Sequence, residues 1–516
     1  MRIDRTKNAR NGIVVGLILR VYQTVVPFIM RTVMIHFMGV EYLGLNSLFS
    51  SVLHILNLAE LGVGSAMVFS MYRPIAQDDS QKICALMKLY RKYYRVIGFV
   101  ILTAGLLLLP FLSRLITGSV PPDINLYTLY LLNLLATVLT YWLFAYRNCL
   151  LQAHQRQDVI GLITLLSSTI QFSLQFWVLC SIRNYYAYVI IQLLGTIFNN
   201  VFTAIVTKRI YPEYLPVGTL DDCESRQINK RIRDLFAGKV GTVVVQYADT
   251  LVISTFLGLA ALAVYQNYYF IMGAVLAIFE MILGSVLAGL GNSFVTESKE
   301  KNENDLMKFS FLYFWLVGVC CCCFLGLYQP FMEIWVGQEL MLSYAIVISF
   351  VLYFFVYTLV RFLNIYKDAA GLWHEDRFRP LLSAFVNLSL NLMTVQRWGL
   401  FGVILSTVIS IVLISIPWLM HILFSKVFEK ALLRFMRQLL MFMVMTAAAG
   451  MGVSLICQAI PLDSWLKLIS CMLVCVFVPN AVFFVLARRS GQFAPSVRLL
   501  DRLAKGKLGL EKKLIS

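Results

Sequence analysis

Two arginines lie inside the first long apolar stretch of the chain, where an ionisable side chain is costly and is by default a functional candidate. Arg20 and Arg31 are eleven residues apart, and about 100° of rotation per residue returns this spacing to one face of an α-helix. The pair therefore predicts a cationic stripe on the first membrane helix. Such a stripe is suited to an anionic cargo, because guanidinium groups donate charge-assisted hydrogen bonds to oxyanions.

Acidic and basic residues also interrupt later apolar stretches. Glu60 is predicted to lie at a depth similar to that of Arg20, so the two side chains can pair. Lys239 and Glu280 offer a second pair of the same kind. Asp249 lies near mid-depth, where a carboxylate is protonated, paired or bound to a cation. These residues are candidates for charge pairing or for coupling transport to H⁺ or Na⁺.

Two further residues in these stretches suggest a proton carrier and a hinge. His54 is a candidate proton carrier because imidazole titrates near neutral pH; a buried, hydrogen-bonded histidine is the alternative. Pro27 should bend the first helix, either as a hinge for alternating access or as a static kink. The charged residues also have structural alternatives, namely an interhelical ion pair for Arg20 with Glu60 and snorkelling toward the outer interface for Arg31.

Composition identifies the class of protein. The chain has 59% hydrophobic and 14% charged residues, with a mean hydropathy of +0.76, whereas soluble domains carry about 25% charged residues. About fourteen apolar stretches are long enough to cross a hydrocarbon core of about 30 Å. We therefore expect an all-α integral membrane protein with about fourteen transmembrane helices. The expected spans include 45–70, and also 380–397 and 399–421, which only Trp398 and Gly399 separate.

The placement of lysine and arginine predicts the orientation of the chain. With the amino terminus inside, the outside connections contain only Arg114, Arg183, Arg397 and Lys467, as the positive-inside rule requires. Both termini are then expected in the cytoplasm. The net charge of +17 favours anionic inner-leaflet lipids as partners rather than nucleic acid. The basic tail at 488–516 is either an amphipathic surface helix or a solvated segment.

No motif predicts a cofactor, a metal site or an enzyme active site. Four consecutive cysteines at 320–323 point about 100° apart on a helix, so they cannot converge on one metal ion. The sequence lacks Walker, dinucleotide-binding, nucleophile-elbow and zinc motifs. Energy for transport must then come from an ion gradient or from the concentration difference of the cargo.

An internal duplication is indicated by residues that recur at an offset of about 219 residues. The same offset carries Arg20 onto Lys239. The recurring triplets are Phe37, Gly39 and Leu43, and Phe256, Gly258 and Leu262. Two halves of six spans each run in the same sense through the bilayer, as parallel repeats. The expected organisation is a first lobe at 1–207, a cytoplasmic linker at 208–236, a second lobe at 237–425, two further helices at 426–487 and the tail at 488–516.

Three segments resemble a known family of membrane proteins. They are Gly39-Val40-Glu41-Tyr42-Leu43-Gly44-Leu45-Asn46 with the following Leu58-Ala59-Glu60-Leu61-Gly62-Val63-Gly64, then Tyr247-Ala248-Asp249-Thr250-Leu251-Val252-Ile253-Ser254, and finally Gly371-Leu372-Trp373 with Asp376-Arg377-Phe378-Arg379-Pro380. In this order the segments resemble Wzx-type polysaccharide flippases of the multidrug/oligosaccharidyl-lipid/polysaccharide exporter superfamily. The resemblance extends over nearly the whole chain.

The resemblance implies two six-helix lobes around a central cavity, with two further helices at the carboxyl end. It also implies a cargo of undecaprenyl-diphosphate-linked oligosaccharide repeat units, moved by alternating access from the inner to the outer leaflet of a bacterial plasma membrane for capsule or exopolysaccharide synthesis. Basic residues on the first helix of each lobe line the cavity in such relatives, which carries over here to Arg20, Arg31 and Lys239 as diphosphate ligands.

Three acidic residues depart from a uniformly cationic cavity and could bind a coupling ion: Glu60, Asp249 and Glu280. The alternatives to this function are a lipid-II flippase or a multidrug antiporter of the same fold. A membrane glycosyltransferase or polysaccharide polymerase is a further alternative, although the outside loops offer few catalytic residues.

Overall fold

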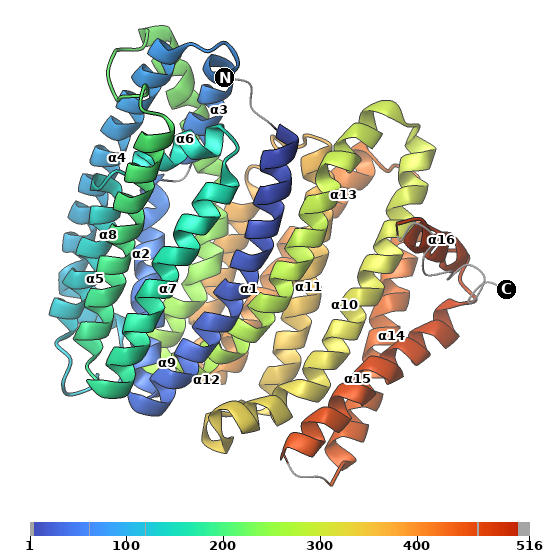
Figure 1. The fold of residues 1–516 in the computed structure, drawn as a ribbon. Helices are drawn as coiled ribbons and strands as arrows, with labels where there is room; N and C mark the ends of the chain where they lie inside the picture. Colours follow the sequence, from blue (N-terminus) through green and yellow to red (C-terminus); the bar gives the residue numbers. More distant parts are fainter. Residues whose placement is uncertain (1–4, 61, 119, 462–463, 504–516) are drawn as a thin grey trace. The chain divides into compact units, whose positions relative to one another are not determined.

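The fold is known from a computed structural model, which describes residues 5–503 except 61, 119, 462 and 463. All regular secondary structure in these residues is helical (Figure 1), which confirms the expected all-α fold. Helices satisfy their backbone hydrogen bonds internally, as a chain surrounded by hydrocarbon must. The described chain divides into two compact units, Met1–Gln266 and Asn267–Ser516.

The number of membrane spans agrees with the sequence. Among the described residues, eleven helices are long and apolar enough to cross a membrane, and a bent pair of helices adds a twelfth crossing. Two of the eleven, Lys239–Thr296 and Arg379–Lys426, contain 58 and 48 residues, whereas about 20 residues suffice for one crossing. Each of these contains one glycine with a non-helical backbone, Gly258 or Gly399. Because the chain turns back at these glycines, each long helix supplies two spans, and the described structure is compatible with fourteen.

The reversal at Gly258 requires glycine for two reasons. Its φ of 88° lies where side chains with a Cβ are rarely found, and a Cβ here would lie 2.6 Å from the carbonyl oxygen of Thr117. Gln266 Nε2 donates to Thr250 Oγ1 at 3.1 Å and so ties the two arms together. Gly39 occupies the matching place in the predicted duplication and has a similar backbone conformation. Its φ and ψ are 114° and 167°, and those of Gly258 are 88° and 178°.

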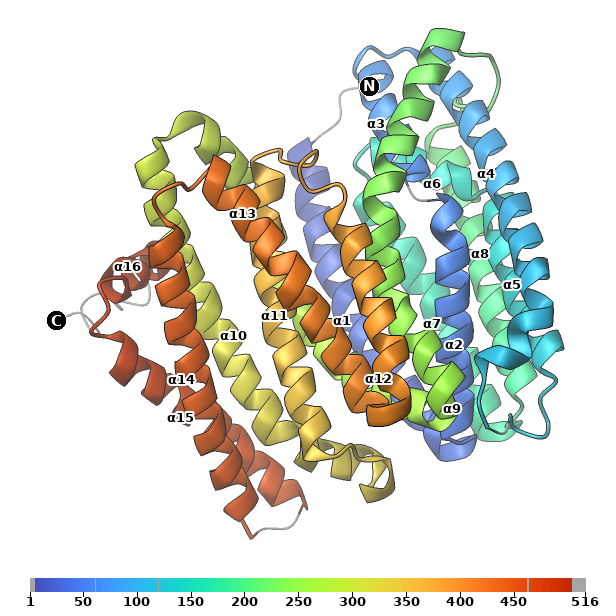
Figure 2. The same ribbon diagram turned by 180° about the vertical axis from the view of Figure 1, so that it is seen from behind.

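The reversal at Gly399 confirms the predicted division between the spans 380–397 and 399–421. Figure 2 shows α12 folded back at this point. Two hydrogen bonds join the arms: Asn387 Nδ2 donates to Thr407 Oγ1 at 2.9 Å, and Ser415 Oγ donates to Ser383 Oγ at 3.2 Å. Polar side chains buried in the span thus find their partners across the turn.

The first unit contains the helices up to the reversal at Gly258 and the beginning of the arm that follows. Asparagine caps start two of its helices, since Asn125 Oδ1 accepts from the backbone of Thr128 and Asn184 Oδ1 from that of Ala187. Its elements are α1 (Arg5–Phe37), α2 (Val40–Leu56), η1 (Asn57–Glu60), α3 (Val63–Ala76), α4 (Ser80–Leu108), η2 (Leu109–Leu115), α5 (Leu126–Trp142), η3 (Ala145–Arg147), α6 (Asn148–Ala153), α7 (Gln157–Ser181), α8 (Tyr185–Ile210) and the first part of α9 (Asp222–Thr296). Within this unit α7 lies between α1 and α8 (Figure 1).

The expected span at 45–70 is wrong in its extent. Helix α2 ends at Leu56, the 3₁₀ segment η1 follows, and Gly62 then adopts a left-handed backbone with φ 93° before α3 begins. Apolar residues continue through this break, so hydropathy alone does not reveal it. As a result, Glu60 lies at the end of a span, on a short segment that changes the direction of the chain.

The second unit contains the remaining helices. Its elements are the rest of α9, α10 (Lys299–Val336), η4 (Gln338–Leu340), α11 (Tyr344–Ala369), α12 (Arg379–Ser410), η5 (Ile411–Ser415), α13 (Ile416–Lys426), α14 (Leu432–Ala459), α15 (Ser464–Ala487) and α16 (Phe493–Leu503). Helix α10 packs against both α14 and α15 (Figure 1). An aromatic core fills this region, formed by Phe311, Phe314, Phe362, Phe435 and Phe442, all of them buried.

The predicted helix in the basic tail is present as α16. Phe493 and Val497 are buried, and the ring of Phe493 lies 6.3 Å from that of Phe311 on α10. Helix α16 therefore uses its apolar face against the protein. The rest of the tail, 504–516, lies outside the described residues, and its interaction with lipid stays a prediction.

A close helix contact gives the first test of the fold. A Cβ at Gly44 on α2 would collide with the backbone of Leu259, whereas a Cβ at Gly16 on α1 meets nothing within 4 Å. We expect Gly44→Ala to destabilise the protein by about 1–3 kcal/mol and Gly16→Ala to leave stability unchanged. Thermal unfolding in mild detergent, followed by tryptophan fluorescence, measures both. An unchanged Tm for Gly44→Ala would contradict the contact.

Candidate functional site

Arg31 lies on α1 with its side chain partly buried in the first unit. Its neighbours Met30 and Met34 are buried, and its guanidinium interacts electrostatically with Tyr188 of α8. The ring of Tyr188 stacks on that of Tyr185, with centroids 5.8 Å apart and planes 10° apart. The cationic group is therefore near the aromatic side chains of α8.

The predicted pairing of Arg20 with Glu60 is wrong. The side chain of Arg20 is exposed on α1, while Glu60 is bound by hydroxyl groups. Glu60 Oε1 accepts from Tyr94 at 2.6 Å, and Oε2 accepts from Tyr141 at 2.7 Å. Glu60 contacts these tyrosines rather than Arg20 because the helix break at η1 directs its carboxylate toward α4 and α5.

The tyrosines around Glu60 were not identified from the sequence. Tyr90 donates to Tyr94 at 2.7 Å, so a chain of hydroxyl groups leads to the carboxylate. The rings of Tyr90, Tyr94 and Tyr141 are buried. The spacing of Tyr90 and Tyr94 places both on one face of α4, which is the one local signal for this cluster.

His54 lies at the wall of a polar cavity of about 220 Å³ in the first unit. Its ring stacks on that of Tyr247, with centroids 4.9 Å apart and planes 10° apart, and its side chain is exposed. The alternative of a buried histidine is therefore wrong. The cavity is surrounded by α2, η1, α5 and α8.

Asp249 and Lys239 both lie on the first arm of α9. Asp249 is 8% exposed, next to the Thr250 hydroxyl that accepts from Gln266. Lys239 is exposed. In the described part of the chain, no group of three or more histidine, cysteine, aspartate or glutamate side chains could hold a metal ion. The roles of Asp249 and Lys239 stay predictions.

Glu280 forms an ion pair in the second unit, with a partner other than the predicted Lys239. Its Oε1 lies 2.8 Å from Nη2 of Arg361 on α11, and both side chains are about two-fifths exposed. No local sequence pattern predicts this pair, because the two residues lie on different helices and are distant in the chain. Glu280 is therefore a charge-pairing residue.

Pro27, the predicted hinge, lies inside α1, which continues through it as one helix. Proline lacks an N–H, so one backbone carbonyl in the preceding turn loses its helical donor. The hinge role stays a prediction.

An apolar groove of about 510 Å³ lies in the second unit between α10, α11 and α14. Hydrocarbon side chains form most of its wall, including Leu325, Ile348, Leu352, Met443 and Leu455. Such a surface favours a hydrocarbon chain over water-soluble groups.

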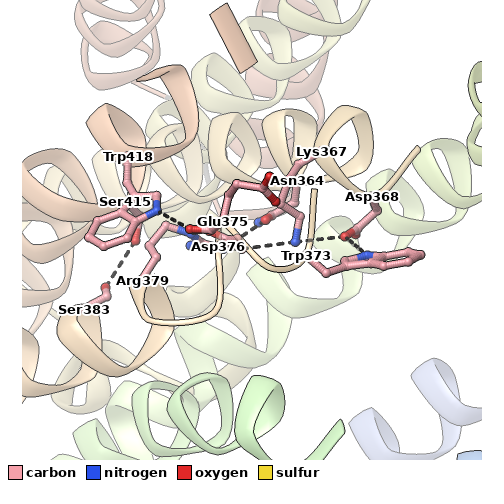
Figure 3. Close-up of polar contacts among 10 residues, drawn as sticks. All are labelled: Asn364, Lys367, Asp368, Trp373, Glu375, Asp376, Arg379, Ser383, Ser415 and Trp418. Carbon is pink, nitrogen blue, oxygen red and sulfur yellow. Dashed lines mark hydrogen bonds and ion pairs between the residues drawn. The ribbon is translucent and has the colours of Figure 1, made fainter. Parts of the chain in front are cut away.

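A buried ion-pair network occupies the turn between α11 and α12 (Figure 3). Asp376 accepts from Arg379 Nε at 2.5 Å and Nη2 at 2.8 Å, and from Lys367 Nζ at 3.1 Å. Arg379 Nη2 also donates to Asn364 at 3.0 Å. The side chains of Asp376, Arg379 and Lys367 are at most 10% exposed. Asp376 thus pairs with both buried cations, and Lys367 Nζ also lies 2.9 Å from Oδ1 of Asp368.

The neighbouring Glu375 extends this network to α13. Its backbone oxygen accepts from Trp418 Nε1 at 3.2 Å, and its carboxylate accepts from Lys426 Nζ at 2.7 Å (Figure 3 shows Glu375 and Trp418). The hydrogen bond from Lys426 lowers the pKa of Glu375. The motif at 371–380 therefore fastens three helices together, which gives this part of the family resemblance a structural explanation.

Comparison with known proteins decides the family. Residues 9–288, more than half of the 516-residue chain, match the family described as "Polysaccharide biosynthesis protein". The chain belongs to this family. A search of the curated proteins returns no match. The matched segment contains all seven intramembrane residues singled out in the sequence as diphosphate ligands or as ion-coupling or charge-pairing residues.

Solved structures support the same fold. The inward closed conformation of the lipid II flippase MurJ aligns with a TM-score of 0.68 at 14% identity, covering 92% of this chain and 98% of that one. An inward-facing multidrug resistance MATE family transporter of the MOP superfamily aligns with a TM-score of 0.62 at 14% identity, covering 80% and 99%. The Vibrio cholerae MATE transporter VcmN aligns with a TM-score of 0.55 at 12% identity, covering 82% and 99%.

Together these findings confirm the polysaccharide family and the fold expected from the sequence. The protein is a multi-pass membrane protein whose family and structural neighbours are flippases and transporters rather than enzymes.

The network around Asp376 gives the second test. Asp376→Asn leaves the buried Arg379 without its carboxylate and leaves Lys367 with Asp368 alone, so we expect a loss of about 3–5 kcal/mol in stability. Glu375→Gln removes the more exposed pair with Lys426 and should cost much less, because water screens it. Thermal unfolding in detergent compares the two variants. Equal losses would show that Asp376 does not hold the turn together.

Proposed function

We propose that this protein is a flippase for undecaprenyl-diphosphate-linked oligosaccharide repeat units, moving them from the inner to the outer leaflet of a bacterial plasma membrane for capsule or exopolysaccharide synthesis. Membership of the polysaccharide biosynthesis family supports this proposal. The observation that carries it is the partly buried guanidinium of Arg31 inside the first span, beside Tyr188. A transporter of purely apolar cargo has no use for such a group.

The proposed ligands of the diphosphate are Arg31, Arg20 and Lys239. Hydrocarbon cannot solvate a diphosphate, so guanidinium donors in a wet cavity would replace its hydration during the crossing. Arg20 lies on the Arg31 helix, and Lys239 begins the matching span of the predicted repeat. Both side chains are exposed and therefore accessible to a ligand.

The apolar groove between α10, α11 and α14 offers a surface for part of the polyprenyl chain. A long hydrocarbon tail is stabilised by any apolar wall that keeps it from water.

Coupling to an ion gradient is assigned first to Asp249. Asp249 is a carboxylate that lies within a membrane span and is only 8% exposed, whereas the side chain of Glu280 is about two-fifths exposed. A carboxylate in this setting can bind H⁺ or Na⁺ as the cavity opens alternately to each side. The proposed orientation has both termini in the cytoplasm, with the basic loops against anionic lipids.

A lipid-II flippase is the second candidate, favoured by the structural likeness to MurJ. Both cargoes share the polyprenyl diphosphate and differ in the sugar. Cells that lack one flippase or the other separate them, because rescue requires the matching glycan.

The diphosphate assignment is tested in cells that lack their own polysaccharide flippase. Arg20→Gln together with Arg31→Gln should reduce glycan export at least about tenfold, because the oxyanion loses its charged donors. Intact lipid-linked repeat units should then accumulate inside. Arg114→Gln, which changes an exposed arginine outside the long helices, is the control and should export normally. Normal export by the double variant, at normal membrane levels, would refute the assignment.

The coupling assignment is tested in proteoliposomes with an imposed H⁺ or Na⁺ gradient. Asp249→Asn should abolish the response of flipping to the gradient while slow movement down the cargo gradient persists. Glu280→Gln, which alters a paired carboxylate, should retain the response. A variant at Asp249 that still responds fully would move the coupling site elsewhere.

A further inference from the structure

A polar cavity inside the first unit is not explained by the diphosphate or by the tail. It has a volume of about 220 Å³ and lies among α2, η1, α5 and α8. Its wall contains Ser50, Asn57, Asn133, Thr137, Gln192 and Thr196. Leucine at these positions would suit a membrane span better, because polar groups facing hydrocarbon are costly. The polar wall therefore points to a hydrophilic occupant.

The hydrogen-bonding groups of the wall are rich in acceptors. Thr137, Thr140 and Thr196 each donate their hydroxyl proton at 3.0 Å to a backbone carbonyl four residues earlier on their own helix. Because their protons are engaged, these hydroxyl groups can only accept hydrogen bonds from a ligand in the cavity. Asn57 Oδ1 is also buried and accepts no hydrogen bond within the described protein. The best occupant is one that donates several hydrogen bonds.

Charge and size exclude other classes of ligand. The cavity wall contains no lysine, arginine, aspartate or glutamate among the described residues that line it, and a diphosphate needs donors rather than acceptors. A bare cation requires oxygens at about 2.0–2.6 Å, and 220 Å³ far exceeds the space for one water, about 10–15 Å³. A hydrocarbon chain would leave the polar wall unsatisfied.

We propose that this cavity is a subsite for one sugar residue of the lipid-linked glycan, a proposal that rests on the proposed function. Hydroxyl and acetamido groups donate to the threonine and asparagine oxygens, while Gln192 and His54 supply donors in return. Tyr141 forms part of the wall, and its hydroxyl is fixed by Glu60 at 2.7 Å. Glu60 is thus a positioning residue for the subsite. Glu60→Ala, which removes both acceptors, should lower the sugar preference, whereas Glu60→Gln, whose single amide oxygen can accept from Tyr141, should retain more of it.

The subsite is tested by comparing two ligands on the purified protein in nanodiscs. One ligand is undecaprenyl diphosphate, and the other is the lipid-linked glycan fraction extracted from the cells that make this protein. Native mass spectrometry measures the occupancy of each. We expect the unaltered protein to bind the glycan-bearing lipid about tenfold more tightly, since several hydrogen bonds add to the shared diphosphate contacts.

Two kinds of variant should remove this preference. Asn133→Leu with Gln192→Leu deletes hydrogen-bonding groups, and Ala136→Phe fills the cavity; both should bind the two lipids about equally. Thr169→Val, on the exposed face of α7, is the control and should keep the preference. If both cavity variants retain the preference for glycan, the subsite assignment is overturned.

The same measurement separates this proposal from the proposed function. Arg31→Gln should weaken the binding of both lipids equally, because it removes a contact to the diphosphate that both lipids contain. If Arg31→Gln changes neither affinity while the cavity variants lose the glycan preference, the diphosphate site fails and the sugar subsite stands. If the unaltered protein binds neither lipid, both are refuted.

Discussion

The cost of placing a polar or charged side chain in hydrocarbon constrains this whole structure. Each such group must find a partner in the protein, water or a ligand. Arg31 meets this requirement beside Tyr188, inside the first unit. This guanidinium inside the first span is the basis of the proposed anionic cargo.

The polar groups of the two units satisfy this constraint in different ways. In the second unit several charged groups pair with one another, as in Glu280 with Arg361 and Asp376 with Arg379 and Lys367. In the first unit, the wall of the polar cavity keeps acceptors that the protein does not use. Ion pairs within the protein stabilise the fold, whereas hydrogen-bond acceptors without a donor in the protein are available to a ligand. The proposed ligand recognition is therefore assigned to the first unit, while the network around α11, α12 and α13 fastens these three helices together.

Features set by composition and local backbone chemistry could be predicted from the sequence. Hydropathy identified the membrane class, and the glycines at 258 and 399 marked the two reversals, because few other residues allow such a backbone. The span at 45–70 was wrong because its apolar residues continue through a break made by Gly62. Hydropathy measures transfer to lipid and contains no information on where a helix changes direction.

Contacts between distant helices could not be predicted in the same way. Similar depth suggested that Arg20 and Glu60 pair, but depth leaves the rotation of each helix undefined. Tyr94 and Tyr141 take the place of Arg20 because η1 turns Glu60 toward α4 and α5. Arg361 was missed for a related reason: its partner Glu280 is on another helix, and the sequence carries no spacing that links them.

The most direct test of the central claim is an experimental structure of the protein in a lipid bilayer with undecaprenyl diphosphate bound. If Arg31 binds the diphosphate, we expect the phosphate oxygens to lie within hydrogen-bonding distance of its guanidinium, about 2.7–2.9 Å, in a chamber open to water. A diphosphate bound elsewhere, with the Arg31 guanidinium facing acyl chains, would contradict it.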